Sequence, residues 1–155
     1  MSAALVDRRP DAGIDTERLV AIAREAAASV AHDARTPVAP AGERRHVRIR
    51  CTDDHDVWII VWGVRSGVEL HDHGDSAGAF AVASGELTET APADGPTVIR
   101  RVGAGDERAL AAGTLHAVRN DGPAVAVSVH VYAPPLRAMG FYDDARNELG
   151  REVVA

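Results

Sequence analysis

The sequence contains no lysine and no glutamine, so all 17 basic side chains are arginines. Its single cysteine, Cys51, cannot form an internal disulfide, which argues against an oxidising compartment. Aromatic residues make up only 4% of the chain, and no apolar run approaches the length of a membrane span. These absences argue against a disulfide scaffold and a membrane-spanning protein, and we expect a soluble cytoplasmic protein.

The net charge of the chain limits the kinds of molecule that we expect it to bind. A net charge of −6 disfavours electrostatic capture of nucleic acid or anionic lipid, both of which need clustered cations. A length of 155 residues with 46% hydrophobic side chains predicts one domain with one core. We expect a monomer or weak homo-oligomer that binds small molecules, with neither nucleic acid nor membrane as a partner.

The first part of the chain divides into a leader and a helical segment. Residues 1–14 are small and polar, which predicts a flexible leader. Residues 15–44 predict a helix followed by a connector, with Asp15 as the N-cap. The apolar residues Leu19, Ile22, Ala23, Ala26, Ala27 and Val30 recur at the spacing of one helical face. We expect this helix to pack against the domain that follows.

Residues 45–155 have a different pattern, because short apolar runs alternate with Gly, Asp and Pro. Many short strands separated by turn residues favour an all-β sandwich or barrel. In the tail, 136–155, the sequence indicates a turn and a short strand around Arg151–Val154. The expected strands before that tail are 45–51, 56–63, 67–71, 78–84, 86–90, 97–102, 108–111, 115–119 and 124–132.

A histidine pair gives the first indication of chemistry. His71 and His73 are two residues apart, and on a strand this spacing places both imidazoles on one face, with Asp72 pointing away. Two neutral nitrogens on one face can bind one metal ion. Taken alone, such a pair is weak evidence, because histidine pairs also occur on protein surfaces.

The spacing of the following residues strengthens the metal hypothesis. It resembles the two motifs of cupin barrels, in which His116 in the second motif would join His71 and His73. Gly78 stands where the first motif has a glutamate ligand, and Ala111 stands where the second has a proline. Three neutral imidazoles leave the opposite face of a divalent ion open. Without a carboxylate ligand, the site is expected to favour an anionic thiolate or carboxylate.

The strand at 124–132 supplies independent support. Its valines alternate with a second set of residues that includes Ser128, His130 and Tyr132. A solvated edge strand would explain one such polar side chain, but three in succession favour a small interior cavity. We expect a hydrogen-bonded relay that orients the Tyr132 phenol.

Together these residues resemble the cysteine dioxygenase family of cupin-fold thiol dioxygenases, over roughly residues 45–143. The resemblance implies a cupin-type double-stranded β-helix (jelly-roll) barrel with a short N-terminal helical segment. The residues that carry it are Trp62-Gly63, His71-Asp72-His73-Gly74, Ser76, Gly85-Glu86-Leu87, Gly113, His116 and Ser128-Val129-His130-Val131-Tyr132-Ala133-Pro134-Pro135.

The resemblance also implies a reaction. The cofactor would be non-haem Fe(II), held by His71, His73 and His116, with Ser128, His130 and Tyr132 beside it. The substrates would be a small thiol and O2, with L-cysteine converted to cysteine sulfinic acid. One alternative is a dioxygenase for another thiol acid such as 3-mercaptopropionate. A second alternative is a cupin that binds a metal or ligand without turnover.

Two details of the family bear on this chain. The peptide before the first proline of the pair is often cis, which would apply to Ala133-Pro134. In the animal enzymes a cysteine is crosslinked to the active-site tyrosine, but the matching position here is Gly78, so we expect no crosslink.

The carboxylate anchor of the substrate is an arginine in cysteine-specific family members and a glutamine in members that prefer 3-mercaptopropionate. Since this chain has no glutamine, the resemblance favours an arginine and cysteine. Arg48 is the best match, and Arg50 would share its face of the strand. A guanidinium grips a carboxylate through two charge-assisted hydrogen bonds.

Overall fold

The computed structural model describes residues 14–32 and 37–154. Helix α1 spans Thr16–Ala31, and the side chain of Asp15 accepts a hydrogen bond from the backbone N–H of Arg18 at 2.8 Å. The predicted helix and its cap are therefore confirmed. The expected leader lies almost wholly outside the described residues, as does part of the connector.

The rest of the described chain forms short strands, as the sequence predicts. All nine strands expected before residue 136 are present, with ends shifted by at most two residues. They are β1 Arg44–Cys51, β2 Asp56–Trp62, β3 Gly67–His71, β4 Ala77–Ser84, β5 Glu86–Ala91, β6 Val98–Gly103, β7 Glu107–Leu110, β8 His116–Arg119 and β9 Ala126–Ala133, followed by β10 Ala138–Tyr142 and β11 Glu148–Val153.

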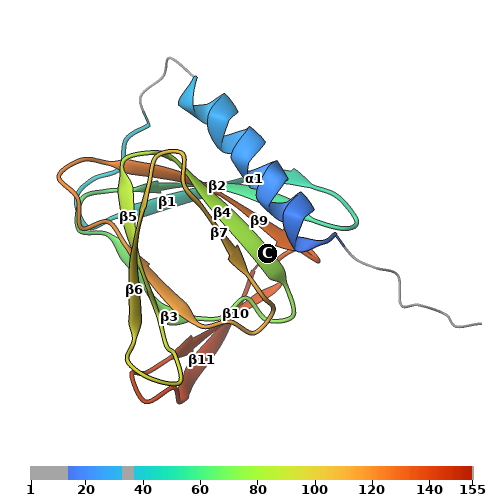
Figure 1. Cartoon of the computed structure of the whole chain (residues 1–155), viewed down its shortest axis with the longest axis vertical. Coiled ribbons are helices and arrows are strands. Elements are labelled where there is room, and N and C mark those ends of the chain that lie inside the picture. The colour runs from blue at the N-terminus through green and yellow to red at the C-terminus, as the bar shows by residue number, and fades with distance from the viewer. Residues whose placement is uncertain (1–13, 33–36, 155) are drawn as a thin grey trace, which may run out of the picture.

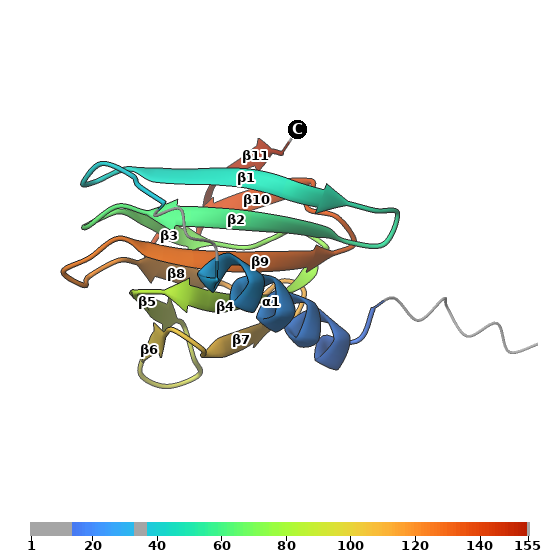
Figure 2. The ribbon, with the colours of Figure 1, turned by 90° about the horizontal axis from the view of Figure 1, so that it is seen from above.

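The strands form two antiparallel sheets. One has the order β1-β2-β9-β4-β7 and the other the order β11-β10-β3-β8-β5-β6. The sheets face each other and enclose a barrel, seen end-on in Figure 1, and α1 lies across the outside of the first sheet (Figure 2). The expected all-β barrel with an N-terminal helix is confirmed.

Two hydrophobic layers hold these parts together. Between α1 and the first sheet, Leu19 and Ile22 pack with Val129 and Val131. Between the two sheets, a second cluster includes Trp62 and Phe80. Strand β9 is buried along its whole length, because its valines face the helix while its other face points into the barrel. The predicted alternation of this strand is thus confirmed.

The tail differs from its prediction. It forms a hairpin, of which the sequence indicated only the second strand, β11. The first, β10, has Gly140 at its centre, and its five residues show no clear alternation. Among the described residues, no helix combines the length and hydropathy needed to cross a membrane.

Candidate metal centre and adjoining cleft

Three buried histidines meet inside the barrel. His71 ends β3, His73 follows it, and His116 begins β8, where it pairs with His71 in the register of the sheet. Each is at most 4% exposed. One ring nitrogen from each lies within 4.8 Å of the others. The structure therefore brings together the three residues that the sequence singles out as metal ligands.

Hydrogen bonds orient two of these rings. Nδ1 of His71 lies 2.7 Å from the backbone carbonyl oxygen of Glu69, and Nδ1 of His116 lies 3.0 Å from the Glu89 carboxylate. Both partners are acceptors, so each Nδ1 carries a proton and leaves the Nε2 lone pair free. Nε2 of His71 lies 3.1 Å from Nε2 of His73, so ring nitrogens of the cluster point toward a common region.

The charge state of the rings suits a metal. Burial lowers the pKa of His71 to about 3 and that of His73 to about 2, and the neighbouring imidazoles add to the effect. These two rings are therefore neutral at pH 7, which is the form that binds metal ions. Three imidazoles whose ring nitrogens meet in this way fit a divalent transition metal with positions left open.

Glu89 is a site residue that sequence reasoning missed. It is 1% exposed, and its carboxylate accepts hydrogen bonds from His116 and from Nε of Arg108, the latter at 2.9 Å. Burial opposes ionisation, but these two partners outweigh it and lower the pKa of Glu89. Glu89 is not part of the histidine cluster, so the expectation of a site without a carboxylate ligand is unchanged, but its carboxylate lies just behind one ligand candidate. The sequence held one signal for this role: Glu89 lies two residues after the apolar Leu87, and the alternation of a strand places both on the same, buried face.

Asp72 points away from the histidines, as predicted, and ties their loop to the C-terminal hairpin. Its carboxylate accepts backbone hydrogen bonds from Gly74 and Gly140, both at 3.0 Å, and one from the Tyr142 hydroxyl at 2.5 Å. Arg151 adds contacts at 3.3 Å. Burial by itself would raise the pKa of Asp72, but these donors lower it below its usual range. The aspartate thus fixes the loop that carries His71 and His73.

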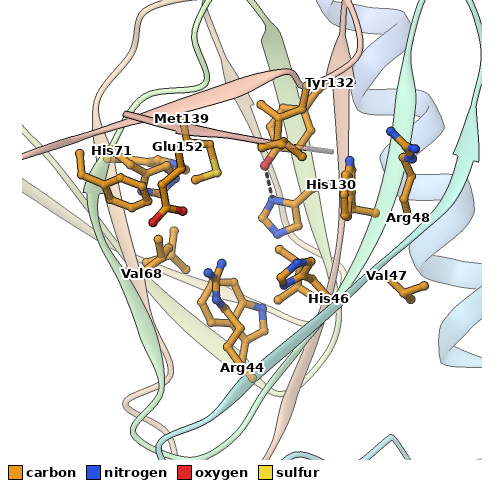
Figure 3. Close-up of a pocket in the computed structure, with 18 of the residues that line it drawn as sticks. Arg44, His46, Val47, Arg48, Val68, His71, His130, Tyr132, Met139 and Glu152 are labelled. Carbon is orange, nitrogen blue, oxygen red and sulfur yellow. Dashed lines mark hydrogen bonds between the residues drawn. The ribbon is translucent and has the colours of Figure 1, made fainter. Parts of the chain in front are cut away.

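The expected relay on β9 is present and longer than predicted. Ser128 Oγ lies 2.8 Å from Nε2 of His130. Nδ1 of His130 in turn lies 3.4 Å from the Tyr132 hydroxyl, a contact drawn in Figure 3. Trp62, which the sequence does not place in the relay, also donates its indole N–H to Ser128 Oγ at 2.8 Å. Its missed role depends on β2 pairing with β9, where Trp62 lies opposite Ala126.

The chemistry of the donors gives this relay a direction. An indole nitrogen can only donate, so the Ser128 hydroxyl proton is left to point at Nε2 of His130. Burial lowers the pKa of His130 well below its usual value, so the ring is neutral and its one proton is on Nδ1, facing Tyr132. Burial also raises the pKa of Tyr132, which keeps the phenol protonated. The Tyr132 O–H is therefore left free to donate into the cleft.

Gly78 leaves no room for a side chain beside Tyr132. A Cβ there would lie 3.0 Å from Cδ1 of the tyrosine ring and 3.0 Å from the Val131 carbonyl oxygen. The one cysteine, Cys51, is exposed on β1. Near the end of β9, the Ala133-Pro134 peptide is cis, as the resemblance implies, and Ser76 Oγ donates to the Pro134 carbonyl at 2.8 Å.

A cleft of about 680 Å³ opens onto the histidines and the relay, and it is lined by His71, His116, His130 and Tyr132. Arg44, His46 and Arg48 line it from β1 (Figure 3). Arg50 is not among its lining residues. A β-bulge between Arg48 and Arg50 shifts the pairing with β2, which breaks the alternation that would have placed both on one face.

The charged residues of the cleft differ in their surroundings. Arg48 lies 4.0 Å from the buried Asp56 carboxylate and over the Trp58 ring. Arg44 lies over the Trp62 ring at 5.4 Å, and burial lowers its pKa. Within the described chain, no carboxylate lies within ion-pair distance of Arg44. The C-terminal hairpin adds Glu152 to the lining, so the cleft carries charges of both signs (Figure 3).

Comparison with known proteins places these features in a family. The sequence profile described as cysteine dioxygenase type I matches residues 11–145. No match was found among curated proteins.

Solved structures share the fold. A Klebsiella pneumoniae protein with a double-stranded β-helix domain has 23% identity and a TM-score of 0.55, covering 76% of this chain and 90% of that one. A Bacillus halodurans protein has 23% identity and a TM-score of 0.53, covering 67% and 85%. The Schizosaccharomyces pombe Cnp3 cupin domain has 10% identity and a TM-score of 0.54, covering 63% and 65%. These matches support the cupin fold.

Proposed function

This chain belongs to the cysteine dioxygenase family, and from that membership we propose that it is a non-haem iron thiol dioxygenase that converts L-cysteine and O2 to cysteine sulfinic acid. One observation carries the proposal. The buried cluster of His71, His73 and His116 lies on the same cleft as a directed relay that ends at the Tyr132 hydroxyl. A cupin that only binds a ligand has no need of an oriented phenol.

The three histidines are the proposed ligands of Fe(II). Their convergent ring nitrogens match the donor set that such an ion takes. Bound there, iron supplies the redox chemistry with O2 and the positive charge that keeps a thiol ionised. Within the protein, the backbone carbonyl of Glu69 and the carboxylate of Glu89 hold the rings of His71 and His116 in the tautomer that leaves Nε2 for the ion.

The walls of the cleft suit a small amino acid. We propose that the substrate carboxylate binds an arginine of β1. Both Arg44 and Arg48 line the cleft, but Arg48 lies 4.0 Å from the Asp56 carboxylate, whereas Arg44 lies over Trp62 with no carboxylate of the described chain within ion-pair distance. Arg50 is the weaker candidate, because it is absent from the lining. Glu152 gives the substrate ammonium a partner of opposite sign, which favours cysteine over 3-mercaptopropionate.

Tyr132 is the proposed hydrogen-bond donor to the reacting groups. Its proton faces the cleft because His130 occupies the other side of the hydroxyl. Burial keeps it protonated, and a donor that is already in place costs no reorganisation when charge develops.

Anaerobic loading with Fe(II), followed by O2-uptake and sulfinate detection by mass spectrometry, tests the function. Cysteine is expected to consume one O2 per sulfinate formed. If 3-mercaptopropionate has the higher kcat/KM, the alternative substrate is correct. No uptake with any thiol in a panel, at full iron loading, would leave a binding protein without turnover.

Substitutions on β1 test the anchor. Arg44→Met and Arg48→Met are each expected to raise the KM for cysteine more than that for cysteamine, which lacks a carboxylate. Arg45→Met is the matched control, because Arg45 is exposed on the same strand and does not line the cleft. If Arg50→Met alone has the effect, the anchor is Arg50. Glu152→Gln is expected to lower the preference for cysteine over 3-mercaptopropionate.

A further inference from the structure

A chain of charged groups runs from one buried metal-ligand candidate outward to two partly exposed arginines. Glu89 accepts a hydrogen bond from Nδ1 of His116 at 3.0 Å and another from Nε of Arg108 at 2.9 Å. A second arginine, Arg100, lies 3.9 Å from the same carboxylate. Glu89 and His116 lie on neighbouring strands of one sheet, while Arg108 belongs to the other sheet. The carboxylate therefore touches a ligand on one side and bridges the sheets on the other.

The three histidines are not supported equally. Nδ1 of His71 faces a neutral backbone carbonyl, while Nδ1 of His116 faces an ionised carboxylate. Burying a carboxylate at 1% exposure is costly, and the two donors offset that cost. A carboxylate behind an imidazole fixes the ring's orientation and makes its other nitrogen a better electron donor. The asymmetry gives His116 the strongest donor character of the three.

We propose that Glu89 is a positioning residue for the metal centre, which holds His116 with Nε2 toward the other imidazoles and strengthens metal binding through its charge. The inference rests on the metal-binding part of the proposed function and does not depend on thiol oxidation. Because no carboxylate is available as a direct ligand at position 78, Glu89 supplies negative charge from behind His116 instead.

The competing explanation is that Glu89 serves only to join the sheets through Arg108. The two roles predict different effects of changing each partner. Loss of the Glu89 charge affects His116 and Arg108 together, whereas loss of Arg108 leaves the contact with His116 intact. If Glu89 only joins the sheets, substitution of Glu89 and substitution of Arg108 should change metal affinity equally. If Glu89 positions His116, substitution of Glu89 should have the larger effect.

The test measures affinity for Co²⁺, an air-stable divalent probe, by competition with a chromophoric chelator, together with the visible absorption of the bound ion. Glu89→Gln is expected to weaken Co²⁺ binding about 10- to 100-fold and to shift the spectrum. Arg108→Gln is expected to leave the affinity close to the wild-type value. Thermal unfolding of the metal-free proteins shows how far each variant changes the fold itself.

The double variant Glu89→Gln with Arg108→Gln keeps the test decisive if Glu89→Gln alone does not fold, because two amides can pair with each other. It is expected to bind Co²⁺ as weakly as Glu89→Gln. Wild-type affinity in the double variant would overturn the proposal, and so would equal losses in Glu89→Gln and Arg108→Gln. Failure of thiol oxidation with Co²⁺ affinity behaving as expected would contradict the proposed reaction alone.

Discussion

Replacing Ser128 with alanine tests the relay without any metal or substrate. The Ser128 hydroxyl is fully buried and bridges the Trp62 indole N–H and Nε2 of His130, two groups that have no other side-chain partner among the described residues. Alanine removes both hydrogen bonds and leaves a donor and an acceptor unsatisfied inside the barrel. The change in volume is a single oxygen atom, so packing changes little.

The magnitude follows from those two groups. Each buried polar group left without a partner costs about 1–3 kcal/mol. The free energy of unfolding should therefore fall by at least about 2 kcal/mol. With an m-value of about 2 kcal/mol/M, the urea midpoint should drop by about 1 M or more.

Ser66 offers a matched control within the same protein. It is 2% exposed, and its hydroxyl has no hydrogen-bond partner among the described residues. Its backbone groups bond to Gly63 and Asn120 whatever the side chain is. Ser66→Ala should therefore change the free energy of unfolding by less than about 1 kcal/mol.

Urea unfolding followed by circular dichroism, with a chelator present for all three proteins, measures both effects. Tryptophan fluorescence of the same samples reports the loss of the hydrogen bond between Trp62 and Ser128. If Ser128→Ala and Ser66→Ala shift the midpoint equally, the bridging hydrogen bonds contribute no stability and the directed relay is refuted.

Other predictions concern the metal, the phenol and pH. His116→Ala should reduce bound iron from one equivalent to none, while His55→Ala, outside the cluster, should retain it; metal analysis after desalting decides. Tyr132→Phe should keep full iron and lose turnover by about 100-fold, and unchanged kcat would remove the phenol from the mechanism. In the metal-free protein, burial holds the pKa values of His71, His73 and His130 below those of the unfolded chain. The unfolded state then binds more protons than the folded state below about pH 6.5. As the pH is lowered below that value, the free energy of unfolding should decrease, with a slope that approaches about 1.4 kcal/mol per pH unit for each histidine. Constant stability between pH 7.5 and 5.5, measured by urea unfolding, would contradict this.

Several features follow from residues that are close in the chain. The helical spacing from Leu19 to Val30 predicts α1 and its buried face, and the alternation in β9 places Ser128, His130 and Tyr132 together. Backbone geometry alone sets these relations, because side chains repeat every 3.6 residues in a helix and every two in a strand. The spacing of His71 and His73 is likewise a feature that strand periodicity predicts from neighbouring residues.

The choice among the β1 arginines required the structure. Period-two reasoning places Arg48 and Arg50 on one face, and a single bulge separates them. A bulge is set by how one strand pairs with its neighbour, which the residues of β1 alone do not reveal. The same pairing brings Arg44 into the cleft, four residues earlier.

The fold class, the helix, the three histidines and the polar face of β9 can be predicted from the amino-acid sequence, because each depends on local periodicity or on motif spacing. The contact of Glu89 with His116, the hydrogen bond from Trp62 to the relay, and the place of Glu152 in the same cleft as the β1 arginines become visible in the folded barrel. These partners lie on different strands, far apart in the chain. Their meeting depends on the order and register in which the sheets close, and that is a property of the whole barrel.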